Sequence, residues 1–421
     1  MIPAIKRMLS RAPEVSEPAA QSKPEAQSAP RVHSLRDNYH LSQAQHAYCI
    51  SLIDRIEHLY QSAPKYIESM GLDRALFFPG NEWTDIVPIT GVKFRRAFDD
   101  IDYLRLMAPF AGFYLAFLDR LDRRLHEEPW DEELLSRMRQ DGVSDDLVGL
   151  LQERVDPVIR LGACIDVGGG VSSCADEYAR HIHNVPQKYR VRTPRMFGEI
   201  GLDIGGVLVN PDVVLCQSRI NGMIAAGVFD KLDSDLERRG RIRVLEIGGG
   251  YGPLGQALKS IYKDRLEYVA VDLPSILYYP SIYLSTLANG VDCHVLLAGD
   301  AVPDRFNYLF VANYLLEEFG NQLGPVDLAL NAMSFPEMSV DQVKYYAQFL
   351  RRVLRPDGVV FDENAAIKPH HTDSKEIFST FFPFRKRVSS EVVMTKNWCQ
   401  DVWSGCYVPE IFDCSDASLL K

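Results

Sequence analysis

The chain has 421 residues, of which 46% are hydrophobic and 24% are charged, a composition typical of a folded globular protein with roughly two to three domains. Its 46 basic residues against 57 acidic residues give a net charge of −11. Broad contact with a phosphate backbone requires a basic face, so this balance excludes nucleic acid as an expected partner.

The cellular compartment is predicted from what the sequence lacks. Basic residues near the N-terminus (Lys6, Arg7 and Arg11) are not followed by the apolar stretch of a secretory signal, and no apolar run is long enough to span a bilayer. The eight cysteines form no Cys-x-x-Cys pair and fit no common zinc spacing. We therefore expect a cytoplasmic protein with reduced thiols, no transmembrane segment and no metal site.

Composition divides the chain into three regions. Residues 1–38 are rich in Ala, Pro, Ser, Glu and Gln, which predicts a disordered tail because such a segment buries too little apolar surface to offset its ordering entropy. Residues 39–195 carry apolar side chains at three- and four-residue steps, as from Ile50 to Tyr60, which predicts a helical N-terminal domain and a linking region. Residues 196–421 form the expected second domain.

From Val244 onward, short β-rich runs alternate with helical stretches. This alternation predicts βαβ units with right-handed crossovers, and therefore an α/β fold around a mostly parallel sheet. Residues 293–299 are expected to form its third strand, while residues 306–319 stay ambiguous between strand and helix. The segments Val388–Met394 and Val402–Val408 predict an antiparallel hairpin at one edge of the sheet.

A glycine-rich loop follows the first of these strands, Val244–Ile247, and Pro253 marks the start of the next helix. Glycines let the backbone turn sharply and approach a ligand closely. Asp272 ends the next β-rich run, about twenty residues after the loop, where an acidic side chain suits hydrogen bonds to ribose hydroxyls. Strand, loop and acid together predict a site for a nucleotide-containing cofactor.

Two cofactors fit this loop. Gly250, Gly252 and Gly255 spell G-x-G-x-x-G, the fingerprint of dinucleotide-binding proteins. However, Glu246 lies inside a strand that nicotinamide enzymes keep apolar, and none of the 19 tyrosines has a lysine four positions on, as short-chain dehydrogenases require. Both features favour S-adenosylmethionine. A second run, Gly168–Gly170, is an alternative cofactor loop, but it lacks a further glycine and an acid-tipped strand, and we interpret it as a turn.

The pattern Glu-x-Gly-x-Gly-x-Gly at 246–252, with Asp272, resembles class I SAM-dependent methyltransferases. Three blocks within residues 195–365 resemble, more narrowly, the sugar O-methyltransferase family: Phe197–Met223, EIGGGYGPLG with VDLPSILYYPSIYLS, and LALNAMSFPEMSVDQVKYYAQFL. The resemblance implies a Rossmann-like class I methyltransferase sheet preceded by a helical N-terminal domain. It also implies S-adenosyl-L-methionine as cofactor and a sugar hydroxyl of a nucleotide sugar or glycan as methyl acceptor.

The cofactor would lie across the carboxyl ends of the strands, as ligands do in open α/β sheets. The glycine loop would then hold its methionine part, Asp272 with Leu273 its ribose, and Gly299 with Asp300 its adenine edge. The expected cofactor-binding residues are Glu246, Gly248, Gly249, Gly250, Tyr251, Gly252, Asp272, Leu273, Gly299, Asp300 and Asn331.

The acceptor side follows from the same resemblance. The expected substrate-binding residues are Gln217, Arg219, Ser334, Phe335, Asn364 and His370. Because a sugar hydroxyl has a very high pKa, a positioned base assists its methylation, and Glu337 and His371 are the expected catalytic residues. Glu337 also fits a purely structural role, as an acid before the positive end of a helix beginning near Val340.

Two other functions stay open at the level of sequence. The G-x-G-x-x-G string supports an NAD(P)-dependent Rossmann oxidoreductase. The long helical region and the tail leave room for a non-catalytic SAM-binding scaffold in glycan assembly. The sequence also leaves open whether the chain forms an oligomer.

Overall fold

The computed structural model describes residues 32–33, 42–78, 174–192, 194, 201–204, 206–209, 211–364, 371–388 and 409–413. Residues 32–421 form one compact unit. Several predictions fall outside the described residues: most of the tail, the helical pattern over 79–173, the glycine run Gly168–Gly170, His370 and most of the two hairpin segments.

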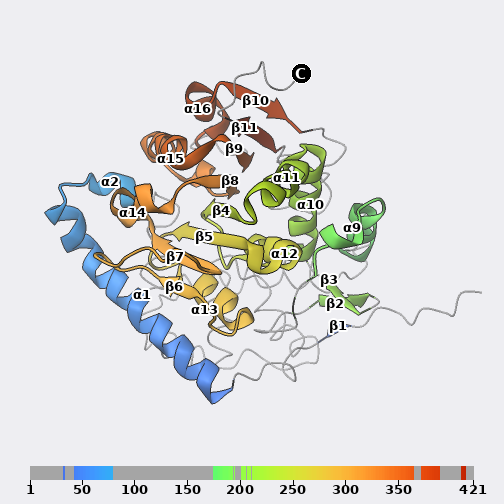
Figure 1. Cartoon of the computed structure of the whole chain (residues 1–421), viewed down its shortest axis with the longest axis horizontal. Coiled ribbons are helices and arrows are strands. Elements are labelled where there is room, and N and C mark those ends of the chain that lie inside the picture. The colour runs from blue at the N-terminus through green and yellow to red at the C-terminus, as the bar shows by residue number, and fades with distance from the viewer. Residues whose placement is uncertain are drawn as a thin grey trace, which may run out of the picture. The chain divides into compact units, whose positions relative to one another are not determined.

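The centre of the structure is an eight-stranded sheet with the order β10-β11-β9-β8-β4-β5-β7-β6 (Figure 1). β11 runs antiparallel to both of its neighbours, and the remaining strands are parallel to one another. The predicted α/β class, with a mostly parallel sheet and an antiparallel edge, is confirmed. The strands are β4 (Ile242–Ile247), β5 (Leu266–Asp272), β6 (Cys293–Val295), β7 (Tyr308–Ala312), β8 (Val326–Ala332), β9 (Leu354–Glu363), β10 (Phe384–Arg387) and β11 (Glu410–Asp413).

Helices cover both faces of the sheet, which is why its central strands are buried along almost their whole length. Three of these helices pack against β4, β5 and β7. Three others pack side by side, each against the next. Right-handed crossovers place these two groups on opposite faces. The first comprises α11 (Val228–Arg239), α12 (Pro253–Tyr262) and α13 (Tyr278–Leu287); the second comprises α14 (Leu316–Leu323), α15 (Val340–Val353) and α16 (Ser374–Phe381).

The sequence did not predict the order of strands on the β5 side. The segment expected as the third strand contains β6, at the edge of the sheet, and β7, from the ambiguous segment 306–319, lies between β6 and β5. Strand pairing is decided by long-range contacts, which local β patterning does not reveal. Asp300, which follows β6, is therefore two strands away from Asp272.

The antiparallel edge of the sheet is the place where the sequence predicts a hairpin. The pairing described there joins β10, which ends at Arg387, to β11, which begins at Glu410, and the two segments predicted to form the hairpin lie, apart from Val388, outside the described residues. A smaller sheet is built from β1 (Val32–His33), β2 (Gly201–Ile204) and β3 (Val207–Val209). Of residues 1–38 the structure describes Val32 and His33, which form β1 and pair with β2, and the disordered tail stays a prediction.

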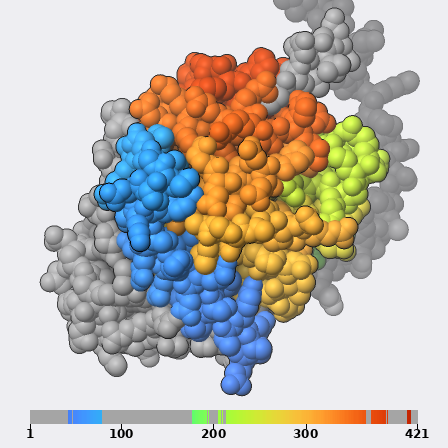
Figure 2. Space-filling view, turned by 60° about the vertical axis from the view of Figure 1, so that its left-hand side comes forward, coloured from blue at the N-terminus to red at the C-terminus, as the bar shows by residue number. Residues whose placement is uncertain are grey.

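Two N-terminal helices pack onto the sheet rather than apart from it; in Figure 2, residues 42–78 (blue) lie directly against the orange part of the chain. α1 contacts α13 and β6, and α2 contacts α15. The Arg55 side chain donates to the Val295 carbonyl at 2.8 Å and pairs with Asp300 at 2.6 Å. The Asn313 side chain, after β7, donates to the Phe77 carbonyl at 3.0 Å. These helices are α1 (Gln43–Ser69) and α2 (Arg74–Phe77).

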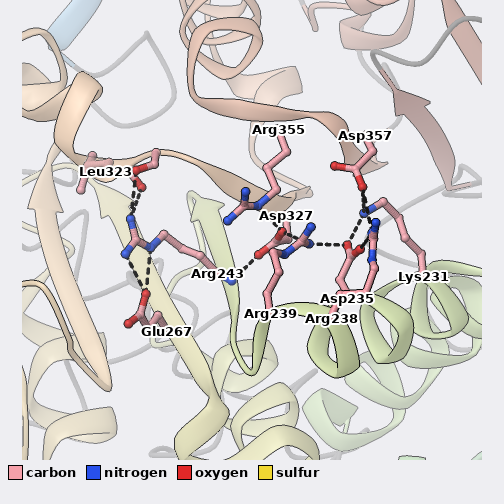
Figure 3. Close-up of polar contacts among 11 residues, drawn as sticks. Lys231, Asp235, Arg238, Arg239, Arg243, Glu267, Leu323, Asp327, Arg355 and Asp357 are labelled. Carbon is pink, nitrogen blue, oxygen red and sulfur yellow. Dashed lines mark hydrogen bonds and ion pairs between the residues drawn. The ribbon is translucent and has the colours of Figure 1, made fainter.

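An ion-pair network joins the amino ends of the strands, at the edge of the sheet opposite the glycine loop (Figure 3). We call it the amino-edge network. Its three buried acids lie among six basic side chains. At its centre, Asp327 is 1% exposed and pairs with Arg239 at 2.5 Å and Arg355 at 2.7 Å. The acids are Asp235, Glu267 and Asp327, and the bases are Lys231, Arg238, Arg239, Arg241, Arg243 and Arg355.

Within the described ranges, no helix combines the length and the apolar character needed to cross a bilayer. In those same ranges, no group of three or more His, Cys, Asp and Glu side chains is arranged to bind a metal ion.

Candidate functional site

The glycine loop follows the carboxyl end of β4, and three of its glycines have a backbone conformation that other residues rarely adopt. Gly248, Gly250 and Gly252 have φ of 69°, 58° and 88°, in the left-handed region that favours glycine. The Gly248 amide donates to the Val271 carbonyl at 2.9 Å, which ties the loop to the end of β5. α12 begins at Pro253, as predicted. The loop therefore lies between the ends of β4 and β5.

Glu246 lies beneath this loop, 3% exposed. A Cβ atom added to Gly249 would lie 2.6 Å from the Glu246 Cδ, so the carboxyl group occupies the space that glycine leaves free. The Tyr268 hydroxyl donates to this carboxyl group. Desolvation raises the pKa of Glu246 to about 8, against the opposing effect of the Arg219 guanidinium. Glu246 thus supports the loop from below.

Arg219 and Glu363 complete a buried cluster of charges around Glu246. Arg219, on α10 (Pro211–Ala225), is 7% exposed, and its Nε donates to Glu363 Oε1 at 3.0 Å. Because both partners are buried, each depends on the other for charge compensation. The structure thus gives Arg219, expected to bind substrate, a partner within the protein at the carboxyl end of β9.

Asp272 ends β5 beside the glycine loop and is half-buried. Its Oδ1 accepts the Leu273 N–H at 2.8 Å. Desolvation raises the pKa of Asp272 to about 7, and the nearby Glu337 carboxylate adds to this, although the backbone amides of Leu273 and Gly250 act in the opposite direction. The expected ribose-binding acid and the expected catalytic Glu337 are therefore brought within electrostatic reach of each other.

The loop after β8 lies against the glycine loop. A Cβ atom on Gly248 would lie 2.6 Å from the Ser334 Cβ, so these two loops touch at Gly248. Asn331 is fully buried and holds the contact together: its Nδ2 donates to the Ile247 carbonyl at 2.7 Å, and its Oδ1 accepts the Phe335 N–H at 3.2 Å. Its Oδ1 also accepts the Asn364 amide at 2.9 Å. Both polar ends of Asn331 thus have partners within the chain.

Glu337 ends the short helix η7 (Phe335–Glu337) and is half-buried. The segment carrying His371 packs beside this helix, because the Thr372 N–H donates to the Pro336 carbonyl at 3.1 Å and its hydroxyl donates to the Met338 carbonyl at 2.6 Å. The two expected catalytic residues therefore come from neighbouring segments at the carboxyl edge of the sheet.

Three expected acceptor residues have structural contacts. Gln217 is fully buried, accepts the Val191 N–H at 2.7 Å and donates to the Tyr189 carbonyl at 3.2 Å. The Phe335 ring is fully buried and packs against the rings of Tyr346 and Phe378, so it does not line an open pocket. Asn364, 1% exposed, accepts the Ser334 N–H at 3.1 Å. Of the expected acceptor residues, Ser334 stays half-buried at the loop contact.

The expected adenine residues face the N-terminal helix. Asp300 Oδ2 accepts the Leu297 N–H at 2.8 Å as well as pairing with Arg55, and the Gly299 N–H donates to Glu318 at 2.6 Å. The carboxyl end of the strand beside β5 carries Asn313 instead, 2% exposed, whose Oδ1 has no hydrogen-bond partner. The predicted adenine residues thus follow β6 rather than β7, the strand that pairs with β5, and their contact with adenine stays a prediction.

Tyr268 and Tyr346 were missed by the sequence analysis. The Tyr268 ring fills the space opposite Gly255, where an added Cβ would lie 2.6 Å from its Cε1. Tyr346, on α15, is 4% exposed, and desolvation, with a smaller effect of the Asp272 carboxylate, raises its pKa. A signal for Tyr268 was available in the sequence. Tyr268 precedes Asp272 by an even number of residues, so both lie on one face of the strand, and the helix that covers this face carries a glycine.

Replacing Gly248 by alanine tests how tightly the two loops fit. The substitution forces a left-handed φ on alanine and overlaps Ser334, so we expect a loss of about 3 kcal/mol in unfolding free energy. Gly240→Ala is the matched control, because Gly240 has φ of 73° but open space around it, and it should cost about 1 kcal/mol. Adding Ser334→Gly to Gly248→Ala should recover part of the loss in urea denaturation; no recovery would contradict the contact.

The strand order and the loop decide the fold. The sequence predicts a mostly parallel sheet with an antiparallel edge and a glycine loop after its first strand, and the order β6-β7-β5-β4-β8-β9-β11-β10, with an antiparallel β11 and a glycine loop after β4, has these features. The described part of the chain has the class I methyltransferase fold.

Several solved structures are similar to the chain at low identity. They include a protein named as an O-methyltransferase from Nostoc punctiforme PCC 73102 (16% identity, 48% of this chain and 60% of that chain, TM-score 0.30). WbdD, a bifunctional kinase-methyltransferase, is 16% identical over 56% of this chain and 47% of that chain, with a TM-score of 0.33. The cyclopropane synthase MmaA2 from Mycobacterium tuberculosis is 14% identical over 41% of this chain and 67% of that chain, with a TM-score of 0.25.

The chain spans 60% and 47% of the lengths of the first two of these proteins. No protein-family model and no curated protein matches the sequence. With TM-scores of 0.33 and below, these similarities add nothing to what the chain's own residues indicate about activity.

Proposed function

We propose that this protein is a SAM-dependent O-methyltransferase that acts on a sugar hydroxyl of a nucleotide sugar or glycan. The observation that carries the proposal is the position of Asp272, a half-buried acid at the tip of β5 beside a loop with three left-handed glycines. A carboxylate there suits a ribose, and a loop of this conformation leaves backbone groups free to approach a ligand. The sugar acceptor rests on the sequence resemblance alone.

The residues present fit the cofactor. Glycines at 248, 249 and 252 occupy positions where a side chain would overlap Ser334, Glu246 and Leu284, so the loop can keep this conformation only with glycine there. Asp272 has one oxygen bonded to the Leu273 N–H and would accept hydrogen bonds from the ribose hydroxyls with the rest of its capacity. When bound, S-adenosyl-L-methionine supplies an activated methyl group. The protein then orients the acceptor and removes one proton.

Glu337 is our first candidate for the base that accepts that proton. It lies on η7 close enough to Asp272 to affect its pKa, and Thr372 holds the flanking carbonyls of Pro336 and Met338. A fixed carboxylate at the carboxyl edge can accept the hydroxyl proton of the acceptor as its oxygen bonds to the methyl group. His371, next to Thr372, is the second candidate.

Calorimetric titration with S-adenosylhomocysteine, alongside NADPH, tests the cofactor. We expect binding of S-adenosylhomocysteine and none of NADPH. NADPH binding without S-adenosylhomocysteine binding would support the oxidoreductase instead. S-adenosylhomocysteine binding without turnover of any sugar acceptor would support the non-catalytic scaffold.

Binding of S-adenosylhomocysteine should strengthen as the pH rises from 6 to 8. The pKa of Asp272 is about 7, so its carboxylate is about one-tenth ionised at pH 6 and about nine-tenths ionised at pH 8. Only the ionised form can accept hydrogen bonds from two hydroxyls with both oxygens, which predicts up to about a tenfold fall in Kd. Glu246 titrates nearby with a pKa of about 8, so calorimetry on Glu246→Gln separates the two acids. A pH-independent Kd would contradict the role of Asp272.

A further inference from the structure

Three cations lie in a row on a short segment outside the candidate site. Lys188, Arg190 and Arg192 alternate with Tyr189 and Val191, which are 7% and 4% exposed. Arg190 has extended backbone angles, φ −80° and ψ 121°, so the side chains on either side of Val191 point the same way. Burial of the two apolar residues therefore presents all three cations on the outer side of the segment.

Buried side chains fix the backbone that carries these cations. Gln217 bonds both the Tyr189 carbonyl and the Val191 N–H, at 3.2 and 2.7 Å. The Tyr178 hydroxyl, on α9 (Cys174–Ile182), donates to the Val191 carbonyl at 3.0 Å. A cationic segment held in this way loses less conformational freedom when it binds a ligand than a mobile chain would. The role found for Gln217 is thus to position this segment.

The three cations line a groove of about 440 Å³, together with Gln187 and Ser260. This volume is in the range of small-molecule sites. Ser260 lies in the last turn of α12, at the opposite end of that helix from Gly252, so the groove is separate from the glycine loop. None of the lining residues is acidic, although the chain as a whole carries a net charge of −11.

The cations differ in how far they are already compensated. Lys188 pairs with Asp233 at 3.0 Å, outside the lining of the groove. The Arg190 Nε donates to the Val185 carbonyl at 2.9 Å, which leaves the charge of its guanidinium uncompensated by that bond. Among the residues described, the Arg192 guanidinium has neither a hydrogen bond nor an ion pair. Within the described part of the chain, neither guanidinium group has an acidic partner, so both can pair with an anion.

We propose that this groove binds a small phosphate-bearing anion of the diphosphate class. The planar guanidinium fork matches phosphate oxygens with two parallel hydrogen bonds, and two arginines on one side of a fixed segment suit a ligand with two phosphoryl groups. The Gln187 amide supplies a neutral donor beside them, whereas the Ser260 hydroxyl donates its proton to the Ala257 carbonyl at 2.7 Å. This proposal does not depend on the proposed methyl-transfer activity.

Titration of the full chain with inorganic pyrophosphate at low salt tests this proposal, with inorganic phosphate as the single-phosphoryl probe. We expect pyrophosphate to bind more tightly than phosphate, and Arg192→Gln and Arg190→Gln to weaken pyrophosphate binding at least tenfold. Arg192→Lys should retain part of the affinity because it keeps the charge. Arg351→Gln, at an exposed arginine in the last turn of α15, is the matched control and should change Kd less than twofold.

Two results would overturn the proposal: no pyrophosphate binding by the unsubstituted chain, or equal losses in Arg192→Gln and Arg351→Gln, which would indicate nonspecific charge attraction. Binding of S-adenosylhomocysteine is measured on the same variants and should not change. The anion site and the cofactor site can therefore fail independently, and far-ultraviolet circular dichroism checks that each variant is folded.

Discussion

Replacing Asp272 by asparagine should weaken the binding of S-adenosylhomocysteine about 100-fold, which corresponds to about 2.7 kcal/mol. The substitution keeps the size of the side chain and an oxygen for the Leu273 N–H, which Asp272 Oδ1 accepts at 2.8 Å. It removes the negative charge and replaces one acceptor oxygen by an amide donor, so the pair of hydrogen bonds to ribose hydroxyls is lost. Charge-assisted hydrogen bonds contribute about 1.5–3 kcal/mol each, which sets the size of the effect.

Asp300→Asn is the matched control for this experiment. The Asp300 side chain is 37% exposed, and its carboxylate pairs with Arg55 and accepts the Leu297 N–H. It follows β6, with β7 between that strand and β5. We expect its Kd for S-adenosylhomocysteine to stay within threefold of the unsubstituted chain. If Asp272→Asn bound as well as Asp300→Asn, the cofactor site assigned to β5 would be wrong.

Replacing Asp327 by asparagine should lower the unfolding free energy by about 3–5 kcal/mol, the range seen when one partner of a buried ion pair is removed. Asp327 is 1% exposed, and its carboxylate pairs with Arg239 and Arg355. The same carboxylate accepts the backbone N–H of Arg243 at 2.7 Å. The neutral amide removes the ion-pair partner that Arg355 has among the described residues, and it leaves Arg239 to pair with Asp235. Urea denaturation measures the loss.

Asp341→Asn serves as the control for the amino-edge network. The Asp341 side chain is 81% exposed and pairs with Lys344 at 3.7 Å, so its loss should cost less than about 0.5 kcal/mol. A similar, small loss in both variants would mean that the network contributes little to stability. Because the network lies at the edge opposite the glycine loop, we also expect folded Asp327→Asn to bind S-adenosylhomocysteine normally.

Elements fixed by local pattern could be predicted from the sequence. The strand before the glycine loop, the helix starting at Pro253, and the helix starting near Val340 follow from apolar runs, glycine conformation and a capping box. The pairing of β7 beside β5 could not, because two β-rich runs of similar composition compete for that place and only tertiary packing selects one.

The site shows the same limit at the level of single residues. Glu246 and Asp272 were found because their positions on strands fix where they end up. The roles of Gln217 and Asn331 could not be predicted, since a buried amide is recruited by whichever backbone groups lack partners in the folded chain. Sequence reasoning identified polar residues near the right edge of the sheet, but it could not separate those that face a ligand from those that hold loops together.

The packing of α1 has a consequence for synthesis of the chain. The Tyr48 hydroxyl bonds the Cys293 carbonyl, and Arg55 pairs with Asp300, each across 245 residues of sequence. At translation rates of about 5–20 residues per second, α1 leaves the ribosome roughly 10 to 50 s before the strand it packs on exists. During that time its apolar side, which includes Ile53 and Ile56, has no sheet to cover. The nascent N-terminal half should therefore be the form of this protein that binds chaperones most strongly.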